Sequence, residues 1–127
     1  MKVDRIYHFW YIYFVEFSVE LLDEAVDFIL SLSVKMQAKV QRTISLLKSF
    51  GYKLPEPHSR KIIGTKNLFE LRIKLGSDIC RLFYFYWKDK IYLITSGYIK
   101  KSNKLDKKQL NKALSLMNHV KKEENND

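Results

Sequence analysis

The spacing of apolar side chains predicts a strand and two helices in the first half of the chain. Ile6 to Phe17 is an almost unbroken run of aromatic and β-branched residues, which predicts a buried opening strand. From Val19 the apolar residues recur at helical spacing, with Ser18 as N-cap. A second helix begins after Ser33 and stops at Gly51. So short a connection predicts an antiparallel helix hairpin.

The second half of the chain changes to the periodicity of strands. Three short strands are predicted over residues 67–75, 79–87 and 91–98, separated by turn residues, as in an antiparallel meander. A final helix starts at Asp106, which forms a capping-box pattern with Gln109. The order of these elements predicts an α+β fold.

Length and composition favour one domain. The 127 residues, 46% of them hydrophobic, suffice for one core, with residues 1–5 and 121–127 expected to be disordered or frayed. The lone cysteine, Cys80, fits a reducing cytoplasm, and the apolar run from Phe9 to Val15 is far too short for a membrane span. We therefore expect a single cytoplasmic domain over residues 1–127.

The positive charge is concentrated after the first helix. The chain carries a net charge of +9, with −4 in residues 1–34 and +16 in residues 35–122. Such a field attracts polyanions, chiefly RNA or DNA, because lysine and arginine displace counterions from phosphates. The alternative is a solvated basic surface that keeps the protein soluble.

Alternation along the strands predicts which charges share a face. Glu70, Arg72 and Lys74 point away from the apolar side of the first meander strand. Arg81 in the next strand shares its face with aromatic residues that include Phe83. We expect an open face on which these cations lie beside aromatics that stack on bases. In the alternative reading, the aromatics are ordinary core.

Three short motifs in the same order resemble a known family. They are Leu68–Arg72, Arg81–Tyr84 and Gly97–Lys104, read as (aromatic)-Glu-Leu-Arg, Arg-(apolar)-(apolar)-Tyr and Lys-Lys-Ser-(polar)-Lys. The pattern is similar to the RelE/ParE toxin superfamily, and within it to the HigB-like, phage Gp49-like branch. The resemblance runs from about Tyr13 to Val120 and implies a RelE-like fold.

This resemblance implies the toxin of a type II toxin–antitoxin module. Such toxins enter the ribosomal A site and cleave messenger RNA there, and a helix-turn-helix, HigA-like antitoxin neutralises them. By resemblance, Arg72 and Arg81 hold and polarise the scissile phosphate, and Lys100 or Lys101 matches a basic position. Phe69 departs from a frequent tryptophan, and the final helix lacks the tyrosine that some RelE relatives use.

Cleavage of RNA without a metal or a cofactor needs fixed positive charges near the phosphate and groups that accept and donate protons. Guanidinium groups stabilise charge that develops on phosphoryl oxygens. A base must accept the 2′ proton and an acid must protonate the leaving 5′ oxygen. The candidates, among which the sequence does not choose, are His58, Lys61, Lys74, Glu70 and Tyr98.

The expected site has a catalytic part and a binding part, without metal ligands. The expected catalytic residues are Arg72, Arg81, Lys101 and His58. The expected RNA- and phosphate-binding residues are Lys61, Lys74, Tyr98, Lys100 and Lys104. Two other functions stay open: a ParE-like toxin that inhibits DNA gyrase, and a non-catalytic basic module that binds nucleic acid.

Overall fold

The computed structural model describes residues 17–100 and 105–126. The elements are β1 (Ser18–Leu21), α2 (Asp23–Leu30), α3 (Val34–Phe50), a 3-10 turn (Gly51–Lys53), β2 (Ser59–Lys61), β3 (Phe69–Leu75), β4 (Asp78–Lys88), β5 (Ile91–Lys100) and α4 (Lys107–Asn126). The predicted opening strand lies outside the described residues except for Phe17. No helix in the described ranges is long and apolar enough to cross a membrane.

The strands form one five-stranded sheet in the order β1-β5-β4-β3-β2. β3, β4 and β5 form the predicted antiparallel meander, and β2 adds antiparallel to its outer edge. β1 pairs with β5 in parallel, so the N-terminal strand lies beside the last one. The sequence analysis did not predict β2, because a strand of three residues is too short to show an alternating pattern.

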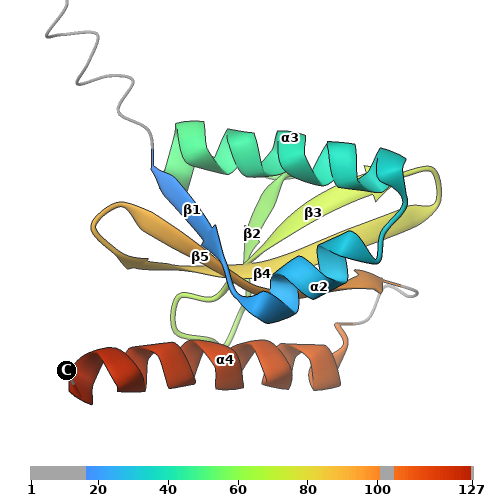
Figure 1. The fold of residues 1–127 in the computed structure, drawn as a ribbon. Helices are drawn as coiled ribbons and strands as arrows, with labels where there is room; N and C mark the ends of the chain where they lie inside the picture. The colour runs from blue at the N-terminus through green and yellow to red at the C-terminus, as the bar shows by residue number, and fades with distance from the viewer. Residues whose placement is uncertain (1–16, 101–104, 127) are drawn as a thin grey trace, which may run out of the picture.

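Helices cover both faces of the sheet (Figure 1). α2 and α3 pack on one face, with Leu71 and Leu82 in the core between them and the strands. α4 packs on the other face over Phe83 and Phe85, which are fully buried. The expected open face with exposed aromatics is therefore wrong, because α4 covers it.

In the helix hairpin, the start of the second helix agrees with the prediction and the start of the first helix does not. The Ser33 hydroxyl accepts a hydrogen bond from the Met36 backbone N–H at 3.1 Å, which confirms the predicted cap of α3. The first helix starts at Asp23 rather than Val19. Ser18 is therefore a strand residue and not an N-cap, because residues 18–21 pair with β5.

The last helix begins where the sequence predicts. The Asp106 carboxylate accepts backbone N–H groups of Lys108 at 3.0 Å and Gln109 at 3.2 Å, as an N-cap does. The helix then continues to Asn126, through most of the segment that we expected to fray.

Candidate functional site

The strand register gathers arginines on the face of the sheet that α4 covers. Arg72 on β3 is the direct partner of Arg81 on β4, and Arg60 on β2 is the direct partner of Glu70 on β3. Because side chains two apart on a strand share a face, Glu70 and Arg72 point to the same side. We call Arg60, Arg72 and Arg81, with Glu70 between them, the arginine cluster.

Arg81 is the buried member of the arginine cluster. Its side chain forms an ion pair with the Glu70 carboxylate, and the two residues are only 2% and 5% exposed. Burial lowers the pKa of Arg81, and the Glu70 carboxylate opposes that shift. The sequence analysis expected Arg81 on an open face; the structure places it beneath the surface with a carboxylate partner.

Three polar atoms in this buried region have no hydrogen-bond partner among the described residues. They are Glu70 Oε2, Arg81 Nε and the Tyr98 hydroxyl. Tyr98 is the direct partner of Arg81 in the register of β4 and β5, and its ring stacks on Phe83 with centroids 5.7 Å apart. The Asp106 backbone lies near the Tyr98 hydroxyl without meeting hydrogen-bond geometry. Buried polar atoms are nearly always paired, so we expect ordered water or a ligand to pair these three.

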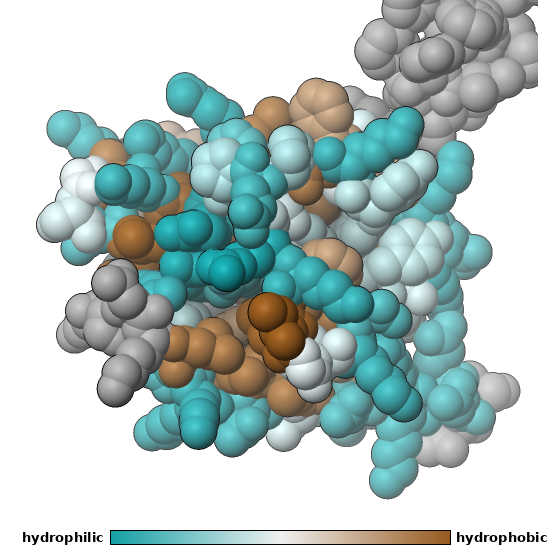
Figure 2. Space-filling view, turned by 180° about the vertical axis from the view of Figure 1, so that it is seen from behind, coloured by the Kyte–Doolittle hydropathy of each residue, from teal (hydrophilic) through white to brown (hydrophobic). Residues whose placement is uncertain are grey.

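Lys100 extends the positive charge to the end of β5. It is two residues beyond Tyr98 and therefore on the same face. Partial burial lowers the pKa of Lys100, and the charge of Arg81 lowers it further. Lys100 borders a pocket of about 210 Å³ with Arg60 and Glu70. Seen from behind, hydrophilic residues form a band across the middle of this side of the molecule (Figure 2).

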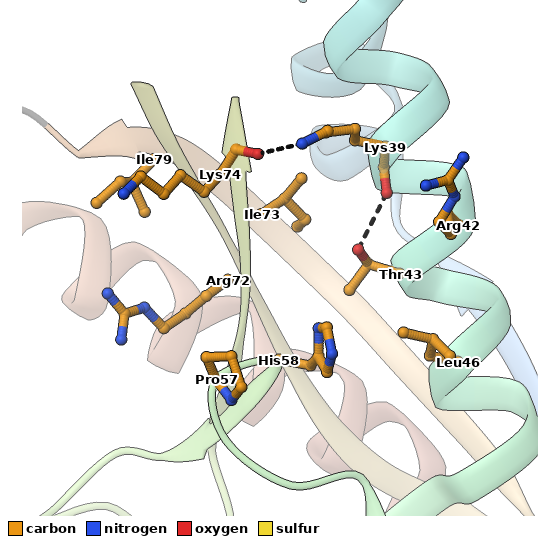
Figure 3. A pocket seen from close by; sticks show the side chains of 10 residues that line it. All are labelled: Lys39, Arg42, Thr43, Leu46, Pro57, His58, Arg72, Ile73, Lys74 and Ile79. Carbon is orange, nitrogen blue, oxygen red and sulfur yellow. Dashed lines mark hydrogen bonds between the residues drawn. The ribbon is translucent and has the colours of Figure 1, made fainter. Parts of the chain in front are cut away.

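A second pocket lies at the edge of the sheet, between α3 and β3, and has a volume of about 360 Å³ (Figure 3). His58 lies in this pocket, toward α3. The guanidinium group of Arg72 and the side chain of Lys74 point the other way, away from α3 (Figure 3). The His58 backbone carbonyl accepts a hydrogen bond from the Arg72 N–H at 3.0 Å, so the two residues are adjacent although their side chains diverge.

The remaining expected residues are Lys61, Lys101 and Lys104. Ser59 forms a hydrogen bond with the buried Tyr84 hydroxyl on the α3 side, and alternation along β2 puts Lys61 on that same side. Lys61 nevertheless also borders the pocket that Arg60, Glu70 and Lys100 line. Lys101 and Lys104 lie outside the described residues. The sequence analysis missed Arg60, which only the pairing of β2 with β3 brings to Glu70.

Metal ligands do not converge in the described part of the chain. No group of three His, Cys, Asp or Glu side chains there is placed to hold a metal ion. The free Cys80 is fully buried in the core, as expected of a small apolar residue.

Comparison with known proteins gives one family and one fold. Residues 27–118 match the model of the family described as phage-derived protein Gp49-like. No curated protein matches the chain.

Two solved structures of similar fold are from Escherichia coli. A chain of the intact RelBE toxin–antitoxin complex is 16% identical, with a TM-score of 0.50 over 69% of this chain and 99% of that one. The isolated RelE toxin in its P21 form is 14% identical, with a TM-score of 0.50 over 75% and 94%. At these identities the likeness concerns the fold.

Proposed function

The chain belongs to the phage-derived protein Gp49-like family and has a RelE-like fold, and from this premise we propose that it is the toxin of a type II toxin–antitoxin module. We further propose that it cleaves messenger RNA on the ribosome. The observation that carries this proposal is the direct pairing of Arg72 with Arg81, two fixed guanidinium groups with one carboxylate beside them.

The charge balance of the cluster suits a phosphodiester. Arg60, Arg72, Arg81 and Lys100 carry four positive charges on this face, and Glu70 carries one negative charge. Among the described ion pairs, Arg72 and Lys100 have no carboxylate partner. Their free charges therefore remain available for phosphate oxygens, which arginine and lysine both bind.

The proposed reaction is attack of the 2′ oxygen on the adjacent phosphorus. The new bond joins that oxygen to phosphorus, the bond from phosphorus to the 5′ oxygen breaks, and the products are a 2′,3′-cyclic phosphate and a 5′ hydroxyl. Negative charge grows on the phosphoryl oxygens in between. Arg72 is partly exposed and contacts these oxygens, whereas the buried Arg81 contributes a fixed charge below them.

Lys100 is the group that we propose for protonating the leaving 5′ oxygen. It lies on the same face as Arg81 and at the border of the pocket. A lysine ammonium whose pKa is lowered gives up its proton more readily. The 2′ proton passes to solvent water or to a side chain of the site; His58 fits this step less well, because its ring points away from the cluster.

The partner that we propose is an antitoxin encoded beside the toxin, which blocks the basic face until it is removed. Production of the chain alone is expected to arrest growth, and co-production of the neighbouring gene is expected to restore it. Purified chain is expected to cut messenger RNA on translating ribosomes much faster than naked RNA.

Arg72→Ala tests the site directly, because Arg72 is partly exposed and its loss leaves the Arg81–Glu70 pair in place. We expect messenger cleavage to fall by at least about 100-fold, as on removal of one oxyanion donor. Lys122→Ala, an exposed cation on α4, is the matched control and should cleave normally.

Three other results would count against this function. If wild-type chain leaves growth and messenger RNA intact, the toxin proposal fails. If it arrests growth without RNA cleavage but with gyrase inhibition, the ParE-like alternative holds. If it binds RNA tightly without cutting it, the chain is a non-catalytic binding module.

A further inference from the structure

The pocket between α3 and the edge of β3 combines an apolar floor with a basic rim. Leu46, Pro57 and Ile73 line the floor, and the side chains of Lys39 and Arg42 rise from α3 (Figure 3). Its volume of about 360 Å³ is in the range of pockets for small ligands. A ligand that fits must therefore offer a flat or apolar part and a negative charge.

The charges at the rim are not neutralised within the described chain. No acidic residue lines the pocket, and none of the described ion pairs includes Lys39 or Arg42. The Lys39 ammonium donates one hydrogen bond to the Lys74 carbonyl at 2.8 Å. This bond holds the ammonium group at the edge of β3 and leaves two of its three N–H donors for a ligand.

The floor offers surfaces on which a base can stack. His58 presents an imidazole ring beside Pro57, and Leu46 faces it from α3 (Figure 3). Aromatic and imidazole planes bind unpaired bases of single-stranded RNA by stacking, with little dependence on sequence. An acidic peptide would satisfy the cations but would not use the planar floor.

The pocket adjoins the arginine cluster through β3. Arg72 and Lys74 border the pocket, while their charged ends lie on the other side of the strand (Figure 3). An RNA strand whose phosphate lies on Arg72 therefore reaches the pocket by crossing the edge of β3. β2 pairs only with Phe69–Leu71, so the rest of β3 has no neighbouring strand on this side among the described residues.

We propose that this pocket binds one nucleotide of single-stranded RNA next to the cleaved phosphate, with its base on the apolar floor and its phosphate on Arg42 and Lys39. The inference rests on the proposed RNA substrate. It adds a subsite that binds substrate without taking part in bond breaking.

The test measures binding of a short RNA whose 2′ hydroxyls are methylated, so that it cannot be cleaved. The double variant Lys39→Ala/Arg42→Ala should bind it at least about 10-fold more weakly and with a log–log salt slope smaller by roughly 0.7 per lost phosphate contact. Lys35→Ala/Lys48→Ala removes two cations from the same helix outside the pocket and is the matched control. On addition of the RNA, the amide signals of Thr43 and Ile73 should shift in the wild-type NMR spectrum.

A second variant tests the floor separately from the charge. Leu46→Asn keeps both cations and adds no charge, but it puts a polar amide at a partly exposed floor position. It should weaken RNA binding while inorganic phosphate still binds. Equal RNA affinity for the wild type and Lys39→Ala/Arg42→Ala would overturn the inference. So would tighter binding of a poly-glutamate peptide than of the RNA at this pocket.

Failure of this inference can be told apart from failure of the proposed function. If the pocket variants bind and cleave as the wild type does, the cleavage site stands without this subsite. If the wild type binds the methylated RNA in the pocket but never cleaves messenger RNA, the subsite stands and the enzymatic proposal falls.

Discussion

Arg72 and Arg81 lie directly opposite each other on β3 and β4, yet only Arg81 has a carboxylate partner. Like charges at paired positions of a sheet destabilise it. Glu70 reduces that repulsion because it pairs with Arg81 from a position two residues before Arg72. One arginine is thereby fixed as part of the interior, and the other keeps its charge for a ligand.

Loss of Glu70 should destabilise the protein strongly. In Glu70→Ala the guanidinium of Arg81 stays buried without its partner, and breaking a buried pair costs about 3–5 kcal/mol. Urea unfolding followed by circular dichroism measures the loss. The double variant Glu70→Leu/Arg81→Met should lose much less than the sum of the single variants, and additive losses would contradict the pairing.

Arg60 and Lys61 should differ in RNA binding although they are neighbours. Arg60 is the direct partner of Glu70, whereas alternation puts Lys61 on the opposite side of β2, where it only borders the pocket of the cluster. Arg60→Ala should weaken RNA binding and lower the salt slope by about 1 or slightly less, as for one lost phosphate contact. Lys61→Ala should have a clearly smaller effect in the same titration; equal effects would show that both sides of β2 bind RNA.

Stability should fall at alkaline pH because of buried groups that resist ionisation. Burial raises the pKa of Cys80 from 9.0 to about 12 and that of Tyr92 from 10.0 to about 12. The unfolded chain therefore loses these protons first, so their contribution is complete below pH 9 and declines as the pH rises toward 12. Urea unfolding between pH 8 and pH 11 measures the slope.

Cys80→Ala is the variant that checks this assignment. It should unfold with a shallower pH dependence than the wild type above pH 9, because the thiol no longer contributes. In the native wild type, a thiol reagent should react far more slowly than in urea, since Cys80 is fully buried. An unchanged slope would mean that the tyrosines alone are responsible.

A side chain at Gly97 should destabilise the protein. A Cβ atom there would lie 2.5 Å from a methyl group of Leu82 and 2.6 Å from the ring of Phe28. Gly97→Ala should therefore cost about 1–3 kcal/mol of unfolding free energy, as overpacking of a core does. In a double-mutant cycle with Phe28→Leu the losses should be less than additive, because the smaller side chain leaves room; additive losses would place the strain elsewhere.

Local signals predicted much of the fold, and long-range pairing decided the rest. The N-caps at Ser33 and Asp106 are hydrogen bonds between residues that lie within four positions of each other in the sequence. Such local interactions can be predicted from the sequence alone. The first helix was expected too early because the pairing of residues 18–21 with β5 outweighs their helical spacing. Such pairing depends on residues far along the chain.

The sequence predicted the shared strand face of two candidate arginines but not the burial of Arg81. Strand alternation correctly put Arg72 and Arg81 on one side, but it cannot tell whether a helix covers that side. The sequence of β4 does indicate that both of its faces are covered. Leu82 and Phe83 make the two faces apolar, as in a strand buried on both sides. Arg60 was missed because its role depends on the register of β2 with β3.

The position of β5 also fixes when the protein can fold during its own synthesis. β5 lies inside the sheet between β1 and β4, although it is the last strand to be translated. Ser18 cannot pair until Ile91 has been translated, and until then α4 has no complete sheet to cover. Sheets that depend on such distant pairs form late. A growing chain therefore stays without its finished basic face until nearly all of it has left the ribosome, so an interrupted translation product should lack the proposed RNA cleavage.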